Sequence, residues 1–389
     1  METRYLEKFV LSDLKERMVF LGGPRQVGKT TLAKNIGETA FRRPQYLNWD
    51  FPADRQAIQK MEFAPDKDLL VLDEVHKWLR WKGAIKGLYD VTDGKFPILV
   101  TGSARMDVYR KGGDSLLGRY APWTLHPFSV AELAGRSCAA KPFQPLGFPS
   151  ASAWGHAQTL LKFGGFPRPL FAQEEGRLRR WHRERAERLV REDIRDVESV
   201  RDLAALETLV RMLPERAGSI LSVNGLREDL GLAHATVARW IEILERFYYA
   251  FRVPPYAAKI ARAVKKEPKV YLWDWSEVPD AGARFENMVA SHLLKFCHFL
   301  RDAQGWQAEL HFMRDTTGRE VDFLVTVDRK PWFCAECKLA DTAVSPNLAA
   351  LGDQVGVPLR YQVVMQDGVD FEKNGVRVMG AGKFLAGLA

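Results

Sequence analysis

Three short apolar runs near the start of the chain have the pattern of strands that are buried on both faces. They are Met18–Leu21, Leu69–Leu72 and Phe96–Val100, and none alternates with polar residues as a half-exposed strand would. An amphipathic helical pattern over 30–36 follows the first run. Unbroken apolar strands that alternate with helices are typical of a parallel sheet. The first part of the chain is therefore predicted to be an α/β domain.

The middle of the chain is predicted to be mainly helical. Residues 136–156 have no clear period and indicate an irregular insertion, and the run Gly164–Pro167 breaks the chain after a helix. Residues 174–202 form a highly charged helical stretch in which Glu and Arg recur four residues apart, as at Glu184 and Arg188. Such a stretch is either a solvated surface helix or a contact with a neighbouring subunit, and the sequence leaves both interpretations open.

The region 219–275 has the pattern of two helices followed by two strands. A short helix over 222–231 ends at a glycine, and a longer amphipathic helix covers 235–248. Strand-like segments follow at 249–253 and 270–273. This order predicts a helix-turn-helix with the two strands of a wing.

The last third of the chain contains a predicted hairpin that carries charged residues. Segments 318–327 and 331–339 alternate as strands, so Glu336 and Lys338 share one face and Asp322 lies near them. Two carboxylates can hold a divalent cation, and a lysine can stabilise charge on an attacked phosphate. Glu286, near the start of a preceding predicted helix, completes the group. The candidate residues of this nuclease-like site are Glu286, Asp322, Glu336 and Lys338.

Composition narrows the class of protein. The 389 residues are 46% hydrophobic, which argues against a disordered chain, and 57 Lys and Arg against 49 Asp and Glu give a net charge of +8. No apolar run approaches a membrane span, and the N-terminal residues lack the pattern of a signal peptide. Four cysteines are too few for a disulfide framework, and the Cys334/Cys337 pair is interpreted as plain strand thiols. A cytoplasmic protein is expected, and nucleic acid is a permitted partner.

The segment Gly23–Thr30 fits the pattern G-x-x-x-x-G-K-[ST] between a predicted strand and a predicted helix. Its glycines let backbone N–H groups surround phosphates at the positive end of a helix, while Lys29 adds a charge and the Thr30 hydroxyl is a ligand for Mg²⁺. ATP and Mg²⁺ are therefore the expected cofactors. The predicted nucleotide-binding residues are Gly23, Pro24, Arg25, Gln26, Val27, Gly28, Lys29, Thr30 and Thr31.

Residues after the other two apolar runs are candidates for hydrolysis of the bound nucleotide. Asp73 is predicted to position Mg²⁺, and Glu74 to act as a general base towards water. Thr101 or Ser103 could sense the terminal phosphate or orient the water, although Ser103 would serve equally as a helix cap. Arg119, beside a glycine, is the candidate for an arginine that completes a neighbouring subunit's site, with an ordinary structural arginine as the alternative.

Positive charge is concentrated between the two predicted wing strands. Residues 252–269 contain six Lys and Arg against one acid, Glu267, which suits contact with a phosphate backbone. A winged helix that only packs between domains is the alternative. The candidate DNA-contacting residues are His234, Thr236 and Arg239 on the second helix, and Lys259, Arg262, Lys265, Lys266 and Lys269 in the wing.

These motifs together resemble a prokaryotic AAA-plus ATPase family in which the ATPase is joined to a C-terminal domain of unknown function. The resemblance implies four parts: an AAA-plus core at 1–135, a helical lid and linker at 136–215, a winged helix at 216–275 and an end similar to PD-(D/E)XK restriction endonucleases at 276–389. If Arg119 completes a neighbouring subunit's site, the chain forms a homo-oligomer, with a hexameric ring as one form. Ala104–Met106 replaces hydroxyl residues that are common in the family. The segments that carry the resemblance are Gly23–Thr31, Leu72–His76, Val100–Ala104, Leu116–Arg119 and Leu125–Ser129.

The sequence therefore predicts a DNA-binding AAA-plus ATPase that translocates on or remodels DNA, including branched recombination or repair intermediates. Two alternatives remain open from the residues. One is an ATP-regulated, Mg²⁺-dependent DNA nuclease in repair or defence, and the other is a nucleotide-switched protein-interaction module.

Overall fold

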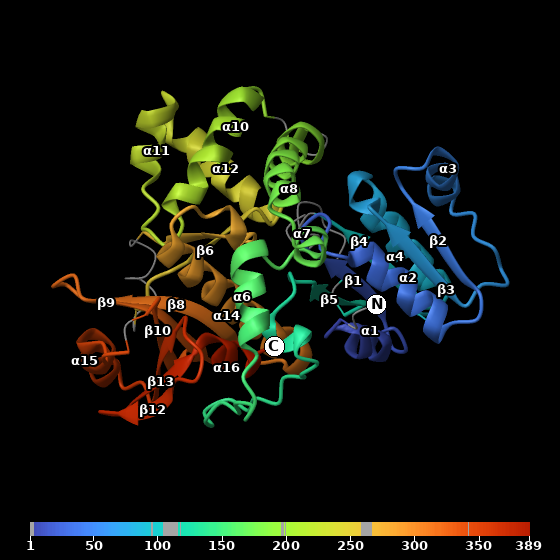
Figure 1. Cartoon of the computed structure of the whole chain (residues 1–389). Helices are drawn as coiled ribbons and strands as arrows, with labels where there is room; N and C mark the ends of the chain where they lie inside the picture. The colour runs from blue at the N-terminus through green and yellow to red at the C-terminus, as the bar shows by residue number, and fades with distance from the viewer. Residues whose placement is uncertain are drawn as a thin grey trace. The chain divides into compact units, whose positions relative to one another are not determined.

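The structure of the chain is a computed structural model in which residues 4–94, 96–103, 116, 118–195, 198, 200–257, 267–340 and 342–389 are described (Figure 1). Contacts divide the chain into two units. The first unit is assembled from three separate stretches, Met1–His126, Glu192–Ser199 and Arg246–Tyr248. The second unit contains Pro127–Arg191, Val200–Glu245 and Tyr249–Ala389.

A five-stranded parallel sheet forms the centre of the first unit. Its order is β2-β3-β4-β1-β5, so β1 lies between β4 and β5 and is separated from β3 by one strand. All residues of β1, β3 and β4 are buried, which confirms the prediction of parallel strands from the three apolar runs. The strands are β1 (Met18–Gly22), β2 (Pro44–Asn48), β3 (Leu69–Asp73), β4 (Ile98–Gly102) and β5 (Tyr120–Thr124).

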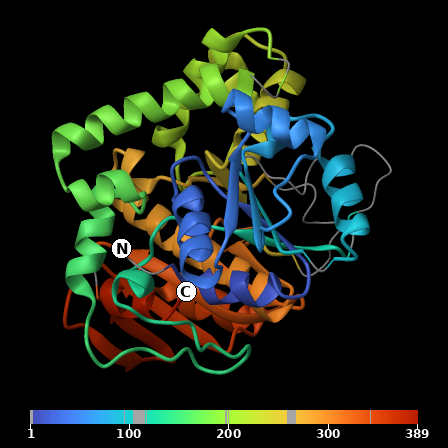
Figure 2. The same ribbon diagram turned by 90° about the vertical axis from the view of Figure 1, so that its right-hand side faces the viewer.

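Helices cover both faces of this sheet, as Figure 2 shows for α2 in blue and α4 in cyan. Because side chains alternate across a strand, one set of strand residues, including Phe20 and Val100, packs with Trp81 and Ile85 of α4. On α2, Leu32, Ala33 and Ile36 are buried. The helices are α1 (Glu7–Asp13), α2 (Lys29–Ala40), α3 (Pro52–Lys60), η1 (Val75–Lys77) and α4 (Trp81–Val91).

The second unit begins with helices. Residues between α5 and α6 form no helix or strand, which agrees with the irregular insertion predicted there, and Gly164 (φ 73°) ends α6 as expected. The predicted charged stretch 174–202 is not one helix: α8 ends at Arg188 and a π-helical turn takes the chain to Ile194. The π-helical turn buries Leu189, Val190 and Ile194, and three charged residues stand between them in the sequence. The helices are α5 (Val130–Leu133), α6 (Trp154–Phe163), α7 (Pro167–Ala172), α8 (Glu175–Arg188), η2 (Leu189–Ile194), α10 (Leu203–Met212) and η3 (Leu213–Arg216). The part of η2 from Glu192 onward belongs to the first unit.

Two further helices and a two-stranded sheet follow in the order that the sequence predicts. Ser222 caps the first helix by accepting a hydrogen bond from the Gly225 N–H, and Gly231 ends it in the left-handed conformation. The second helix buries Val237, Ile241 and Leu244. Strands β6 and β7 pair antiparallel. These elements are α11 (Val223–Leu230), α12 (His234–Arg246), β6 (Ala250–Val253) and β7 (Lys269–Leu272).

A six-stranded mixed sheet forms the C-terminal part of the second unit, in the order β12-β13-β11-β10-β9-β8. Strands β8, β9 and β10 are antiparallel, which confirms the predicted hairpin, whereas β10, β11 and β13 are parallel. Helix α14 packs on the face that carries Phe333, and α15 on the opposite face with Leu324 and Cys334. The elements are η4 (Trp275–Glu277), α14 (Ala281–Gln304), β8 (Ala308–Arg314), β9 (Glu320–Val327), β10 (Lys330–Lys338), α15 (Pro346–Val355), β11 (Leu359–Val364), β12 (Asp370–Lys373), β13 (Val376–Gly380) and α16 (Ala381–Ala386).

Candidate functional site: a phosphate loop and an acidic strand end

The glycine-rich loop lies between β1 and α2, where helix N–H groups favour a bound anion. Gly28 (φ 104°) and Gly23 (φ 148°) both adopt positive φ, and a Cβ on Gly23 would lie 2.5 Å from the Leu125 carbonyl oxygen. The Lys29 ammonium turns back into the loop and donates to the carbonyl oxygens of Gly23 (2.9 Å) and Pro24 (2.8 Å). Burial lowers the pKa of Lys29. The loop is thus held in a curved form by its own lysine.

Asp73, at the end of β3, is the centre of a group of hydroxyls. Its buried carboxylate accepts hydrogen bonds from Thr30 (2.8 Å), from Tyr46 on β2 (2.5 Å) and from Thr101 on β4. Burial, together with the hydrogen bond to Asp73, raises the pKa of Tyr46. Hydroxyl and carboxylate oxygens are hard ligands that suit Mg²⁺, so Thr30 and Asp73 fit the predicted cation. The sequence did not point to Tyr46, because a single tyrosine in a strand carries no motif.

Glu74 follows Asp73 in a backbone conformation that is uncommon for its residue type. Its φ is 57°, in the left-handed region, and such strain is found at functional sites. The Ser103 hydroxyl donates to the Glu74 carboxylate at 3.3 Å, and the Lys77 ammonium lies 3.9 Å from the same oxygen. Thr101 of β4 contacts Asp73, and Ser103, just after β4, contacts Glu74, so the two candidate hydroxyls lie beside different acids.

A second acidic pair contacts the phosphate loop itself. The Arg25 guanidinium lies 2.8 Å from the Glu192 carboxylate and 2.7 Å from the Asp193 carboxylate, and all three residues belong to the first unit. Asp193 is 6% exposed, and burial raises its pKa to about 6. The sequence offered no signal for this contact, because the acids stand in a charged stretch far along the chain.

Arg119 lies just before β5 and forms an ion pair with Asp90 at 3.0 Å.

The DNA-contacting candidates are only partly described. His234 and Arg239 are exposed on α12 and Thr236 is half-buried, whereas Lys259, Arg262, Lys265 and Lys266 lie outside the described residues.

Lys269 does not have the position that the wing prediction gave it. It is 3% exposed, and its ammonium lies among carboxylates of the nuclease-like group rather than on a surface open to phosphates. Arg252, counted with the wing charge, is bound by Glu245 through two hydrogen bonds of 2.9 and 2.6 Å. Two of the six basic residues counted between 252 and 269 are therefore buried or paired with an acid, which spacing along the sequence cannot reveal.

Two of the four nuclease-like candidates, Glu286 and Asp322, lie beside this lysine, together with Glu320. The Lys269 ammonium lies 2.6 Å from Glu320, 3.2 Å from Glu286 and 3.9 Å from Asp322. The predicted pair Glu336 and Lys338 forms an ion pair of 2.9 Å on β10.

The acids of this cluster are poorly solvated. Burial, followed by the charge of Glu286, raises the pKa of Asp322 to about 7, and burial with the charge of Asp322 raises the pKa of Glu336 to about 7. One buried carboxylate oxygen of Glu336, Oε2, has no hydrogen-bond partner among the described residues. Within the part of the chain that the structure describes, no three His, Cys, Asp or Glu side chains are grouped so that they could hold a metal ion. The divalent cation that the PD-(D/E)XK resemblance implies therefore does not fit these residues as they are placed.

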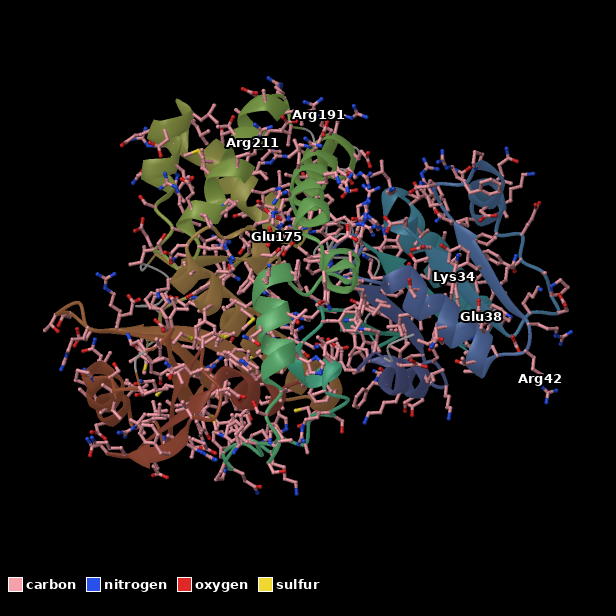
Figure 3. The ribbon with its side chains drawn as sticks, viewed as in Figure 1. Lys34, Glu38, Arg42, Glu175, Arg191 and Arg211 are labelled. Carbon is pink, nitrogen blue, oxygen red and sulfur yellow. The ribbon has the colours of Figure 1, made fainter. Side chains whose placement is uncertain are left out.

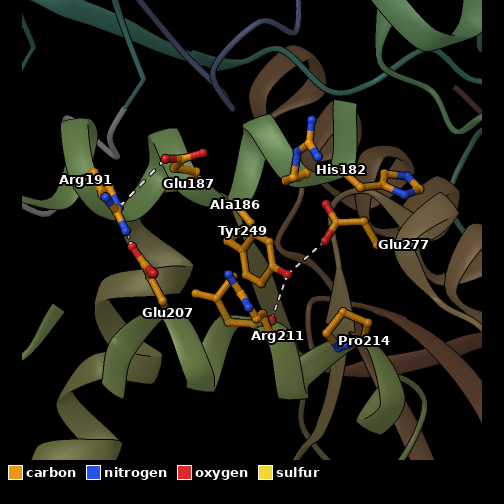
Figure 4. A pocket seen from close by; sticks show the side chains of 11 residues that line it. His182, Ala186, Glu187, Arg191, Glu207, Arg211, Pro214, Tyr249 and Glu277 are labelled. Atoms are coloured by element: carbon orange, nitrogen blue, oxygen red, sulfur yellow. Dashed lines mark hydrogen bonds and ion pairs between the residues drawn. The ribbon is translucent and has the colours of Figure 1, made fainter. Parts of the chain in front are cut away.

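A cavity of about 490 Å³ opens between α8 and α10 of the second unit (Figure 4). Arg191 contacts Glu207 at 2.7 Å and Glu187 at 4.0 Å, while the Tyr249 hydroxyl donates to Glu277 at 2.9 Å. None of its lining residues belongs to the phosphate loop or to the nuclease-like group.

Three family models match successive parts of the chain. Residues 15–134 match a family described as an AAA domain. Residues 156–278 match a domain of unknown function (DUF8612), and residues 281–382 match another (DUF4143). The first unit thus contains an AAA-type domain with a phosphate loop on a parallel sheet, and the resemblance to an AAA protein with a C-terminal domain of unknown function is confirmed.

Distant relatives extend over most of the chain. An uncharacterized protein from Mycobacterium tuberculosis is 21% identical over 81% of this chain and 69% of its own length. An uncharacterized protein from Methanocaldococcus jannaschii is 25% identical over 75% of this chain and 70% of its own length.

Solved structures match more weakly. The RuvB Holliday junction branch migration motor of Thermotoga maritima is 16% identical, with 64% of this chain and 89% of that chain covered and a TM-score of 0.30. PCH-2 of C. elegans is 15% identical, with 62% and 67% covered and a TM-score of 0.24. Scores this low establish no shared overall fold.

In the described residues, no helix is both long and apolar enough to cross a membrane.

Proposed function

We propose that the chain is an ATPase that hydrolyses ATP and uses the turnover to move or remodel DNA. The observation that carries the ATPase proposal is the hydrogen bond of 2.8 Å between the Thr30 hydroxyl and the Asp73 carboxylate. It brings the phosphate loop and the acidic strand end together at the carboxyl edge of a parallel sheet, where ligands bind in such folds. The match of this region to an AAA domain supports the same reaction.

Each residue of the site has a role in this proposal. Backbone N–H groups of Gly23–Thr31 surround the phosphates, and Lys29 leaves its contacts with loop carbonyls to pair with them. Thr30 and Asp73 would hold Mg²⁺, which supplies charge neutralisation at the phosphates. Glu74 withdraws a proton from the attacking water, and Ser103 orients Glu74.

ATP turnover by purified protein tests this assignment. Glu74→Gln should lower kcat by about 10²–10⁴-fold, because the amide cannot accept the proton. Glu38→Gln is the matched control, since Glu38 is an exposed acid on the outer side of α2 and should leave kcat unchanged (Figure 3). If Glu74→Gln kept the same kcat as Glu38→Gln, the proposed role of Glu74 in ATP hydrolysis would be wrong.

An oligomer is part of the proposal, with Arg119 reaching the nucleotide of a neighbouring subunit. Arg119→Ala should abolish turnover while nucleotide binding persists, because an arginine supplied in this way acts on transition-state charge. Asp90→Ala, which removes its partner in the ion pair, is the control and should keep turnover. Loss of nucleotide binding in Arg119→Ala would assign the arginine to its own subunit's site instead.

Support for DNA as the partner comes from the second unit. The order α11, α12, β6 and β7 is that of a helix-turn-helix with two following strands, and α12 exposes His234 and Arg239. The segment between β6 and β7 contains four basic residues, Lys259, Arg262, Lys265 and Lys266. Without Lys269 and Arg252, these four carry the proposed phosphate contacts.

Salt-dependent DNA binding tests this partner. Lys265→Glu with Lys266→Glu should weaken binding and reduce the slope of log K against log salt by about 0.9 per lost phosphate contact. The control reverses the charge of another adjacent basic pair, Arg42 and Arg43, which is exposed in the first unit. An unchanged slope in the lysine variant, or ATP turnover that duplex, forked and four-way DNA leave unaltered, would favour a protein partner.

A further inference from the structure

The nuclease-like cluster contains a cation that belongs to the chain itself. The Lys269 ammonium, on β7, is surrounded by one carboxylate from α14, Glu286, and two from β9, Glu320 and Asp322. Lys269 is 3% exposed, so these carboxylates replace water around its charge. A buried lysine is stabilised only where acids surround it in this way.

The backbone fixes this lysine from both sides. Strand β7 pairs with β6, and on its other edge residue 269 forms a bridge with Ile220. The Gly218 N–H donates to the Val270 carbonyl at 2.8 Å, and the Leu221 N–H to the Pro268 carbonyl at 2.8 Å. Because β7 is hydrogen-bonded along both edges, its backbone cannot move Lys269 away from these acids without breaking hydrogen bonds.

The neighbouring side chains are arranged around the same ammonium. Tyr271, two residues along the strand and therefore on the same face, donates its hydroxyl to Glu286 at 2.7 Å. The Phe312 ring centre lies 5.6 Å from the Lys269 ammonium, within the range of a cation–π contact. Across the hairpin, Asp322 accepts a hydrogen bond of 2.8 Å from the Cys337 N–H.

We propose that Lys269 takes the place of the divalent metal ion in this cluster, so that the C-terminal sheet is not a metal-dependent nuclease centre. A divalent ion needs oxygen ligands at about 2.0–2.6 Å on several sides, and here the oxygens of Glu286 and Glu320 are committed to the ammonium. A metal ion bound beside Lys269 would meet the repulsion of a buried like charge. The ammonium offsets part of the negative charge of these acids, and it does so without an ion from solution.

The test uses the full chain without nucleotide, with Mn²⁺ as the probe. Lys269→Met keeps an unbranched side chain, one heavy atom shorter than lysine, and removes its charge. It should gain one Mn²⁺ site per chain, with an affinity at least about tenfold above that of the wild type. The added substitution Asp322→Asn should remove the new site. Lys269→Arg is the control, because it keeps the positive charge and should gain no site.

A second variant and a second measurement guard against loss of folding. Lys269→Gln removes the charge but can still donate a hydrogen bond to Glu320. In either neutral variant Mn²⁺ should raise the melting temperature, because an ion that binds only the folded state stabilises it.

Three outcomes would overturn the proposal. The first is Mn²⁺ binding by the wild type that Asp322→Asn abolishes. The second is cleavage of plasmid DNA by the wild type with the same dependence on Asp322. The third is that neither neutral variant gains a Mn²⁺ site or a Mn²⁺-dependent rise in melting temperature. None of these measurements depends on ATP turnover, so failure here is distinguishable from failure of the proposed ATPase function.

Discussion

The Arg25 guanidinium, inside the phosphate loop, lies 2.7 Å from the carboxylate of Asp193, which stands 168 residues further along the chain. The loop that is proposed to bind phosphate thus already holds an ion pair with an acid from a remote segment. Asp193 is buried, and Arg25 also contacts the more exposed Glu192. The pair joins the segment Glu192–Ser199 to the phosphate loop within the first unit.

The first prediction concerns the pH dependence of this pair. Burial raises the pKa of Asp193 to about 6, from an ordinary value of 3.8. Between these values the folded chain keeps the proton that the unfolded chain has lost, so the free energy of unfolding falls as pH rises through the interval. In Asp193→Asn this side chain does not titrate, so the variant does not lose stability in this way. Its free energy of unfolding should therefore rise relative to that of the wild type by on the order of 2–3 kcal/mol between about pH 4 and pH 6.

Denaturant unfolding at a series of pH values measures this difference. Glu192→Gln is the control, because it removes the other, half-exposed carboxylate from the same arginine and should add little pH dependence. A constant difference between wild type and Asp193→Asn over the interval would contradict the assignment.

The second prediction concerns the hydroxyl that sequence analysis missed. Tyr46→Phe removes a hydrogen bond of 2.5 Å from Asp73 without changing the shape of the side chain. If Asp73 positions the cation, kcat should fall by about fivefold, as expected for a hydrogen bond worth about 1 kcal/mol. Tyr5→Phe is matched to it, because that hydroxyl bonds the Thr124 carbonyl instead. Equal kcat values in the two variants would show that Tyr46 does not position Asp73.

The third prediction concerns the contact of Gly22 with Tyr248. A Cβ on Gly22, at the end of β1, would lie 2.7 Å from the Tyr248 hydroxyl oxygen. Gly22→Ala should therefore lower the free energy of unfolding by about 1–3 kcal/mol, and Tyr248→Phe should recover part of it by removing that oxygen.

The control for this pair is another glycine-to-alanine change. Gly87 stands inside α4, and a Cβ there meets nothing within 4 Å. Gly87→Ala should raise the free energy of unfolding by about 0.4–1 kcal/mol. If Tyr248→Phe recovered nothing in thermal unfolding, the contact would not be the source of the loss in Gly22→Ala.

The fourth prediction concerns a buried ion pair in the second unit. The Lys295 ammonium contacts Glu132 and donates to the Ser129 hydroxyl at 2.8 Å, and both charged side chains are 2% exposed. Lys295→Met should lower the free energy of unfolding by about 3–5 kcal/mol, because it leaves the Glu132 charge buried without its partner.

Thermal or denaturant unfolding reads out this effect against an exposed pair. Lys162 contacts Glu175 at 2.7 Å with both side chains more than half exposed, so Lys162→Met should change stability by less than about 1 kcal/mol. The double variant Lys295→Met with Glu132→Gln should recover much of the loss. Similar losses in Lys295→Met and Lys162→Met would mean that burial does not set the strength of the pair.

The parts of the fold that the sequence predicted are those that depend on neighbouring residues. The strand Met18–Gly22, the glycines after it and the helix from Lys29 follow one another within a few residues, so pattern and motif agree. Asp322 and Glu336 were predicted to lie near each other because a short turn joins their strands, and the charge of Asp322 does raise the pKa of Glu336.

Contacts between distant segments were beyond the same reasoning. Nothing in the charged stretch around Asp193 distinguishes it from exposed acids nearby, and its burial depends on the tertiary fold. Lys269 was assigned to a basic wing because its neighbours in sequence are basic, whereas its neighbours in space are Glu286 and Glu320. A charge pattern shows which charged residues are neighbours in the sequence. It does not show which basic side chain is surrounded by acids in the folded chain.

The first unit takes residues from three stretches, of which the last ends at Tyr248. During synthesis, the stretch up to His126 leaves the ribosome long before Asp193 and Tyr248 exist. At about 5–20 residues per second, the delay is on the order of ten seconds. Over that time Arg25 has no Asp193 to pair with, and the end of β1 lacks its contact with Tyr248. The first unit therefore cannot complete its folding in the order in which it is translated.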